Sequence, residues 1–469
     1  MNIFSDHFLL LQVIIPLISA LILALSTRKI LYHLSLLAII LNIIISIQIF
    51  NKSLDHSIIY QLGNWAAPLG VEYKVDTLNA IFLLLINIVG LAGLFYGYNS
   101  DELNAPKVKA NIFYSLYLLC LTGMLGIVVT NDIFNIYVFL EIFSLSSYAL
   151  VALGYSRKSL VAAFNYLIIG SISASFILIG IGLIYMITGS LNLTDLTNIT
   201  ESRSNSSNLY MGIVFIIVGI MIKVGLFPAH NWLIRIYEVT PQPVMFLVTG
   251  LSSKISLYII IKLFYKVFPI SILLNNEIGI ILKFIAAGTI IIGSIFAYMQ
   301  KNVRTILAYS TITSTGYVIA SISINDKQSF IAAILIIISD SLTKPVLFLF
   351  NDNYKALMAK LNNEIKYCYI FNYANLIGFP LTLGFISKWY LLSSLIYSSA
   401  WFLVVVVILS SVMSFMYMLK IFKINESKID NINQEQPIFI LKSKIIITSL
   451  TCLNLTLGLS SNIIINYLQ

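Results

Sequence analysis

Five ionisable residues lie deep inside long apolar segments of this chain: Lys223, Lys254, Lys344, Lys388 and Glu141. If those segments cross a bilayer, each charge at its centre costs about 2.5–3.5 kcal/mol, and four lysines facing lipid would cost on the order of 10 kcal/mol. We therefore expect these side chains to face a protein interior or internal water. A series of ionisable groups in such an interior is what a path for protons or other ions requires.

The chemistry that suits buried lysines is proton transfer. Burial removes the hydration that favours the ammonium form, so a buried lysine can take up and release a proton, whereas an exposed lysine stays charged. A neighbouring carboxylate favours the ammonium form again. We expect Glu141 and Lys223 to form such a pair, with a static structural ion pair as the alternative. Asp340 lies four residues before Lys344, a favourable helical spacing, and this pair would either serve transfer or only neutralise two costly charges.

The composition indicates a helical membrane protein. Of the 469 residues, 59% are hydrophobic and 10% are charged, and the mean hydropathy is +0.94, whereas soluble domains are about 25% charged. The apolar runs are about 20 residues long, which suits a membrane-spanning helix, and they lack the alternation of barrel strands. The three cysteines are isolated, the four histidines have no haem-like or zinc-like spacing, and no phosphate-binding glycine loop is present. We therefore expect no cofactor and no enzymatic activity of the chain by itself.

We predict an all-α polytopic membrane protein of about 14 transmembrane helices. The loops after odd-numbered spans carry most of the lysines and arginines, whereas the even-numbered loops, which include Lys262 and Lys266, carry few. By the positive-inside rule the odd-numbered loops are cytoplasmic and both termini are periplasmic. The net charge of +9 then reflects topology rather than nucleic-acid binding, and Lys283, near the outer end of its span, can snorkel to the interface. The predicted spans run near 8–25, 29–50, 75–98, 111–130, 132–154, 160–188, 209–230, 242–265, 276–298, 303–323, 328–350, 367–396, 398–419 and 445–466.

Two of these spans combine a proline break with a buried lysine. Pro228 breaks or kinks the seventh span and follows Lys223 by five residues, whereas Pro380 interrupts the overlong twelfth span and precedes Lys388 by eight. This mirrored order is expected of inverted repeats, and broken helices expose backbone groups to the internal cavities of transporters. His230, close to Pro228, would either link water paths or pack against its neighbours.

Between the second and third spans, residues 51–74 show short alternating patches that favour a β-hairpin outside the membrane.

Six segments, in order, resemble signature segments of the antiporter-like membrane subunits shared by respiratory complex I and the multisubunit Mrp sodium/proton antiporters. The resemblance covers roughly residues 75–420. It implies two inverted five-helix repeats near 111–265 and 276–420, with the seventh and twelfth helices broken. An N-terminal region at 1–110 precedes these repeats, and a cytoplasmic loop with a last span at 421–469 follows them. The matching segments are DIFNIYVFLEIFSLSSYALVALG with Glu141, KVGLFPAHNWL with Lys223, LSSKISLY with Lys254, QKNVRTILAYSTITSTGY at 300–317, SLTKPVLFLF with Lys344 and GFPLTLGFISKW with Lys388.

The resemblance implies a proton-translocating subunit of an Mrp sodium/proton antiporter, of the D type, working with other membrane subunits. Glu141 and Lys223 would modulate and load the path, Lys254 and Lys344 would relay the proton, and Lys388 would pass it to the far side. One alternative is a proton-pumping antiporter-like subunit of complex I, in which electron transfer elsewhere drives transport. The other is a non-transporting assembly subunit.

The chain also departs from the family pattern. Ile234 stands where the family has a proline, and both Tyr237 and Asp340 stand where it has a histidine. The segment 351–376 lacks the usual Gly-Leu and Met-Pro landmarks. These departures would fit either a divergent member or one of reduced activity.

Overall fold

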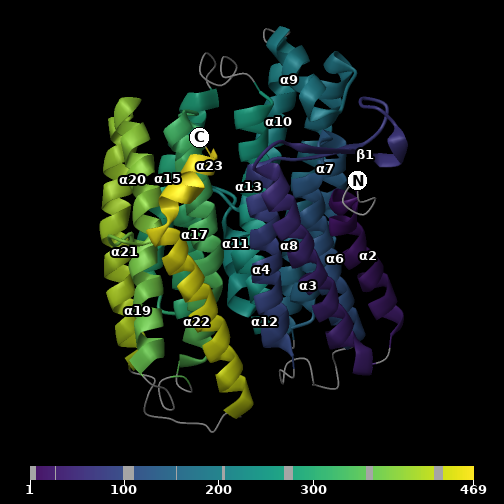
Figure 1. Cartoon of the computed structure of the whole chain (residues 1–469). Coiled ribbons are helices and arrows are strands. Elements are labelled where there is room, and N and C mark those ends of the chain that lie inside the picture. Colours follow the sequence, from purple (N-terminus) through teal and green to yellow (C-terminus); the bar gives the residue numbers. More distant parts are fainter. Residues whose placement is uncertain are drawn as a thin grey trace. The chain divides into compact units, whose positions relative to one another are not determined.

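The computed structural model describes residues 7–26, 28–98, 110–154, 156–202, 206–268, 278–354, 357, 363–426 and 437–468. Over these ranges the chain is helical almost throughout, and it divides into two compact units. The first unit comprises Met1–Lys223, Val239–Val244 and Tyr258–Asn275, and the second comprises Val224–Glu238, Met245–Leu257 and Asn276–Gln469. Figure 1 shows the elements of both units coloured along the sequence.

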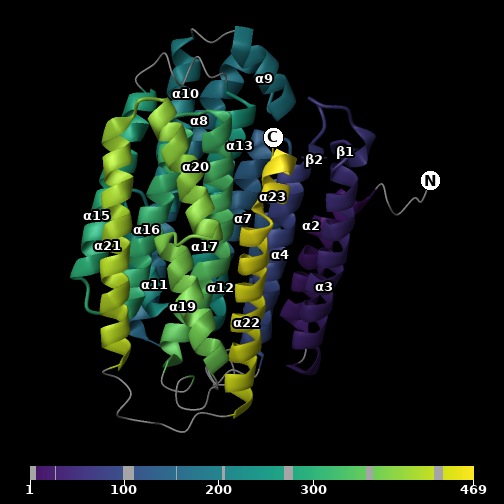
Figure 2. The same ribbon diagram turned by 60° about the vertical axis from the view of Figure 1, so that its left-hand side comes forward.

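The first unit is built mainly from long apolar helices and one β-hairpin. Helices α2, α3, α4 and α6 pack side by side, as Figures 1 and 2 show, and α7 packs closely on α6. Strands β1 and β2 pair antiparallel with Ile58 opposite Val75, which confirms the hairpin predicted between the second and third spans. The elements are α2 (Phe8–Leu25), α3 (Arg28–Ser53), β1 (Ile58–Gln61), η1 (Leu62–Asn64), β2 (Glu72–Val75), α4 (Thr77–Gly97), α6 (Ala110–Val129), α7 (Ile133–Ala152), α8 (Arg157–Thr188), α9 (Leu193–Ser202) and α10 (Ser207–Val224).

The second unit is helical throughout its described residues. Helix α15 packs on α16 and α21, whereas α17 contacts α16, α19, α20 and α22. The segment from α12 to α13 is shared between the two units. The remaining elements are α11 (Asn231–Val239), α12 (Gln242–Leu247), the π-helix η2 (Val248–Ser252), α13 (Ser253–Lys266), α15 (Ile278–Met299), α16 (Val303–Ile322), α17 (Lys327–Asp352), α19 (Asn363–Ile377), α20 (Leu383–Tyr397), α21 (Trp401–Glu426), α22 (Pro437–Leu459) and α23 (Ser461–Leu468).

The all-α polytopic class predicted from the sequence is confirmed. Within the described ranges, eleven helices are long and apolar enough to cross a membrane, and the bent pair α22 and α23 raises this number to as many as twelve. Helices occupy all of the predicted spans. Two of the 14 predicted spans are not among these helices. The tenth, α16, is rich in serine and threonine and so less apolar, and the twelfth is divided into two helices, α19 and α20, of 15 residues each.

Acidic residues start several helices. Asp76 accepts a hydrogen bond from the backbone nitrogen of Asn79 at the start of α4, and Asp132 accepts one from that of Asn135 at the start of α7. Asp326 forms a capping box with Ser329 at the start of α17. A carboxylate at this position binds otherwise unpaired N–H groups and complements the helix dipole, so these helix starts are fixed locally.

Both predicted breaks are present in the backbone. Helix α10 ends at Val224 and α11 begins at Asn231, so Pro228 lies between them. Helix α19 ends at Ile377 and α20 begins at Leu383, so Pro380 lies between them. Gly225 and Gly378 each have a positive φ, of 78° and 88°, which ends the preceding helix at little steric cost. The short helix α11 was not predicted as a separate element, because its nine residues were read as part of a loop.

One ion pair ties helix ends together within the second unit. Arg304, at the start of α16, donates two hydrogen bonds of 2.7 Å to the carboxylate of Asp352 at the end of α17. It also donates one of 2.9 Å to the carbonyl oxygen of Glu238, near the end of α11. A guanidinium is suited to this geometry because its N–H groups form a planar fork.

We expect Arg304→Lys to destabilise the protein by about 2 kcal/mol, since lysine keeps the charge but loses the paired contact to Asp352. Thermal unfolding of the detergent-purified protein measures the effect. Arg157→Lys is the matched control, because Arg157 forms no ion pair with another described residue. Equal unfolding midpoints for the two variants would contradict the prediction.

Candidate functional site

The first unit brings Glu141 and Lys223 together. Glu141 lies near the middle of α7 and Lys223 lies one residue before the end of α10, and their charged groups are 3.9 Å apart. The lysine side chain is 2% exposed and the glutamate side chain 28%. Neither the Lys223 Nζ nor the Glu141 Oε1 has a hydrogen-bond partner among the described residues. The pair is therefore held by charge alone, without hydrogen bonds that would fix its geometry.

The helix that carries Glu141 is locked to α6. A Cβ atom on Gly123 would lie 2.5 Å from the backbone nitrogen of Phe143, and one on Gly126 would lie 2.3 Å from the Phe139 ring. Only glycine permits this close approach of the two helices. Since Phe139 and Phe143 flank Glu141 in sequence, the glycines of α6 fix the position of the carboxylate.

The second unit brings Lys254 and Asp340 together. Their charged groups are 4.0 Å apart, and Asp340 also accepts a hydrogen bond from the Ser314 hydroxyl. Lys254 follows the π-helix η2 and donates a 2.7 Å hydrogen bond to the carbonyl oxygen of Thr249 in it. The π-helix was not predicted, and such single turns occur often at functional sites.

The spacing along α17 predicted an ion pair between Asp340 and Lys344. In the structure Asp340 pairs with Lys254 instead. The Lys344 ammonium instead donates a 2.5 Å hydrogen bond to Ser310 of α16. The reason is that Lys344 finds a direct acceptor on a neighbouring helix, which leaves Asp340 to Lys254 and Ser314. Lys344 is 1% exposed and has no carboxylate within 4.0 Å among the described residues.

Lys388 reaches from α20 across the break to the end of α19. Its ammonium donates hydrogen bonds to the carbonyl oxygens of Ile377, at 2.6 Å, and Leu376, at 3.3 Å. The carboxyl end of a helix carries partial negative charge, so these carbonyls stabilise the ammonium. Gly378 makes room for it, because a Cβ there would lie 3.0 Å from the Lys388 Cδ. The ammonium also lies 5.4 Å from the centre of the Tyr317 ring.

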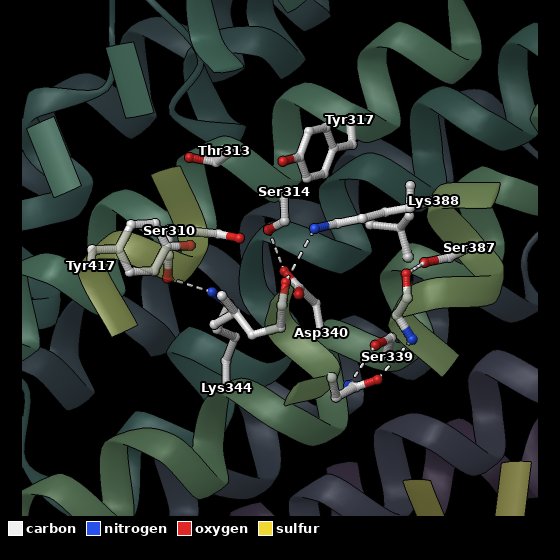
Figure 3. Close-up of a pocket in the computed structure, with 15 residues that line it drawn as sticks. Ser310, Thr313, Ser314, Tyr317, Ser339, Asp340, Lys344, Ser387, Lys388 and Tyr417 are labelled. Atoms are coloured by element: carbon white, nitrogen blue, oxygen red, sulfur yellow. Dashed lines mark hydrogen bonds between the residues drawn. The ribbon is translucent and has the colours of Figure 1, made fainter. Parts of the chain in front are cut away.

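Asp340, Lys344 and Lys388 all line one small polar cavity in the second unit. Its volume is about 30 Å³, enough for a water molecule. Figure 3 shows the Asp340 carboxylate beneath Ser314, with Lys344 directed to Ser310 and Lys388 entering from the other side. The polar side chains that line it are Ser310, Thr313, Ser314, Tyr317, Ser339, Asp340, Lys344, Asn375, Ser387, Lys388, Ser414 and Tyr417.

Asn375 attaches the broken helix to α17. Its amide nitrogen donates to Ser339 at 2.8 Å and to Thr343 at 2.6 Å, and its amide oxygen accepts from the backbone nitrogen of Gly384 at 2.7 Å. One side chain thus bonds both halves of the twelfth span to the helix that carries Asp340. No sequence signal singled out this asparagine.

His230 lies in the break between α10 and α11. Its side chain is 6% exposed, and its ring centre is 6.2 Å from that of Tyr309 and 6.1 Å from that of Phe227. The Nδ1 atom has no hydrogen-bond partner among the described residues. His230 does not line the polar cavity around Asp340.

Sequence reasoning missed Lys262, which it assigned to an outer loop. The residue lies inside α13, is 4% exposed and donates a 2.6 Å hydrogen bond to the carbonyl oxygen of Thr130. Its spacing of eight residues from Lys254 was an available signal, since it places both lysines on one side of a helix. Among the described residues no group of three or more His, Cys, Asp or Glu side chains is placed to hold a metal ion.

Apolar helices with paired charges inside them define a polytopic membrane protein of the ion-translocating kind, and comparisons with known proteins place it more closely. Residues 130–414, well over half of the chain, match the family described as NADH:quinone oxidoreductase/Mrp antiporter, transmembrane. NADH-quinone oxidoreductase subunit N of Desulforudis audaxviator is 34% identical over 377 residues, covering 77% of this chain and 74% of that protein. The chain belongs to this family of antiporter-like membrane subunits.

Two further similarities agree with this assignment. The D-type subunit of the Na⁺/H⁺ antiporter of Bacillus subtilis is 28% identical over 435 residues, covering 89% of this chain and 86% of that protein. In the solved structure of the Mrp complex from Dietzia sp., one chain shares the fold with a TM-score of 0.87 at 19% identity, covering 100% of this chain and 96% of that one.

We expect Asp340→Asn to destabilise the protein by about 3 kcal/mol, because it leaves a buried lysine without its partner while keeping an acceptor for Ser314. The midpoint of thermal unfolding in detergent measures the change. Glu364→Gln is the control: it removes the carboxylate of an exposed pair with Lys444, and we expect about 0.5 kcal/mol or less. An Asp340→Asn midpoint within the range of this control would contradict the prediction.

Proposed function

We propose that this chain is the proton-translocating subunit of a multisubunit sodium/proton antiporter of the Mrp type. It would lie in a bacterial inner membrane and work with partner membrane subunits. The observation that carries the proposal is the set of buried lysines that face carboxylates: Lys223 with Glu141, and Lys254 with Asp340. The family is shared by antiporter and oxidoreductase subunits, and we assign this chain to the antiporter type.

The separation of these pairs suits reversible proton binding. Two unit charges 4 Å apart interact by about 4 kcal/mol at an effective dielectric constant of 20. Withdrawing the carboxylate from 4 Å to about 8 Å halves this interaction and lowers the proton affinity of the lysine by roughly thirtyfold, because about 1.4 kcal/mol corresponds to a factor of ten. Movement of Glu141 or Asp340 by a few ångströms would therefore favour loading or unloading of an amine.

The contacts support the role that we propose for each residue. The Glu141–Lys223 pair, which no hydrogen bond fixes, is the modulating and loading pair. In the second unit, Lys254 and Lys344 relay the proton, and the Asp340 carboxylate stabilises whichever ammonium lies nearer to it. Lys388, bound to the open end of α19, passes the proton to the far side. The inverted five-helix repeats remain part of this proposal, as does the periplasmic location of both termini.

A second candidate is a proton-pumping antiporter-like subunit of an NADH:quinone oxidoreductase. The 34% identity to an oxidoreductase subunit favours it, since the identity to the antiporter relative from Bacillus subtilis is 28%. The two candidates share the same proton path but differ in what drives it. In the first, proton-motive force drives sodium exchange, and in the second, electron transfer elsewhere in the complex drives pumping.

We expect Lys223→Met and Glu141→Gln each to lower proton translocation at least about tenfold, because each removes one partner of a proton-loading pair. Everted membrane vesicles that contain the assembled complex and a fluorescent pH probe measure the rate. Lys283→Met is the control, since Lys283 is the predicted interfacial anchor, and its rate should stay within about twofold of the unmodified complex.

The same vesicles separate the candidates. A proton flux that is triggered by added sodium supports the antiporter, and one triggered by NADH supports the oxidoreductase. Unchanged flux in both Lys223→Met and Glu141→Gln, with normal amounts of complex, would reject the proton path and favour a non-transporting assembly subunit.

A further inference from the structure

Lys262 is a buried charge that the proposed proton path does not use. It lies in the second half of α13, within the first unit, and is 4% exposed. Its ammonium donates to the carbonyl oxygens of Thr130, at 2.6 Å, and Val128, at 3.4 Å. Both acceptors lie at the carboxyl end of α6, where unpaired carbonyls and the helix dipole favour a cation. Lys262 has no carboxylate within 4.0 Å among the described residues.

A polar cavity lies beside Lys262. The cavity measures about 240 Å³, enough for several water molecules. An ammonium has three hydrogens, and two carbonyls account for two of them, which leaves the third for water in the cavity. The charged groups that line this space with Lys262 are Lys74, Asp76 and Lys266, and Asp76 forms an ion pair with Lys266.

The walls of the cavity are fixed by hydrogen bonds. Asn79 accepts from the Tyr258 hydroxyl at 2.7 Å and donates to the carbonyl oxygen of Lys74 at 2.9 Å. Burial would raise the pKa of Asp76, but Lys266 and the more distant Lys262 hold that pKa below its ordinary value. Asp76 therefore stays ionised at neutral pH and pairs with Lys266.

Lys262 binds the turn between α6 and α7, and this turn leads directly into α7, the helix that carries Glu141. Thr130 is followed by Asn131, whose side-chain amide donates a 2.8 Å hydrogen bond to the Glu72 carboxylate. The next residue is Asp132, which caps the start of α7. Glu141 lies nine residues further along α7, about 13 Å at 1.5 Å per residue. Because α6 and α7 are in glycine contact, a shift of the turn moves both helices together.

We propose that Lys262 is a positioning residue: its amine, through hydrogen bonds to the carbonyl oxygens of Thr130 and Val128, fixes the α6–α7 turn to α13 and so sets the position of Glu141 relative to Lys223. The proposal rests on the proposed function of the Glu141–Lys223 pair. Lys262 contributes a fixed charge to that function and does not itself carry the transported proton.

The first test is substitution in everted vesicles that contain the assembled complex. We expect Lys262→Met to lower proton flux about tenfold. Lys262→Arg should restore the flux to within about twofold, because arginine keeps the charge and the N–H donors but does not release a proton. Lys283→Met is again the control, because Lys283 is the predicted interfacial anchor and does not line this cavity, and its flux should stay within about twofold of the unmodified complex. Flux lost in Lys262→Arg as well as in Lys262→Met would overturn the positioning role.

The second test is a double-mutant cycle with Glu141→Gln. If Lys262 acts through Glu141, adding Lys262→Met to Glu141→Gln lowers the flux no further than Glu141→Gln alone. If the two residues act independently, the losses multiply to about a hundredfold, which would overturn the proposal. Flux is normalised to the amount of assembled complex, so that a variant that only fails to assemble does not imitate either result.

The two proposals fail in different ways. If Glu141→Gln leaves the flux unchanged, the proposed function of the pair is wrong. If Glu141→Gln abolishes the flux and Lys262→Met does not change it, the pair stands and the positioning role of Lys262 is wrong.

Discussion

A helix in an apolar environment uses its own backbone groups for its own hydrogen bonds, so a lysine ammonium buried among such helices has few acceptors. This shortage organises much of the structure. Three lysines find carbonyl oxygens where a helix is interrupted: Lys388 at the end of α19, Lys254 at the π-helix before α13, and Lys262 at the end of α6. The irregular places in the backbone are therefore also the places where positive charge is held.

The remaining two lysines of the proposed path are held differently. Lys223 faces the Glu141 carboxylate without a hydrogen bond, and Lys344 donates to the Ser310 hydroxyl. These partners are side chains, which can turn or move, whereas helix-end carbonyls are fixed by the fold. The buried lysines therefore differ in their partners: some bind carbonyl oxygens that the fold fixes, and others bind side chains that can move.

Asp340 shows how tertiary contacts override local spacing. Along α17 it precedes Lys344 by one helical turn, which favours a pair between them. In the folded chain Asp340 instead accepts from Ser314 and lies 4.0 Å from Lys254, which is 86 residues away in sequence. The fold thus places this carboxylate beside Lys254 and in the cavity that Lys344 and Lys388 line. That single negative charge is the electrostatic centre of the cavity in Figure 3.

The sequence by itself determined the helical membrane class, the hairpin before α4, the two breaks at Pro228 and Pro380, and the family. The class, the hairpin and the breaks depend on composition, on periodicity and on the absence of a backbone donor in proline, all of which can be read along the chain. The family rests instead on the resemblance of six ordered segments. Only the tertiary structure decided which charges meet. The partner of Asp340, the anchoring role of Asn375 and the burial of Lys262 depend on contacts between helices far apart in the chain, and a lysine near the end of a predicted span looks the same in sequence whether its ammonium reaches water or a buried carbonyl.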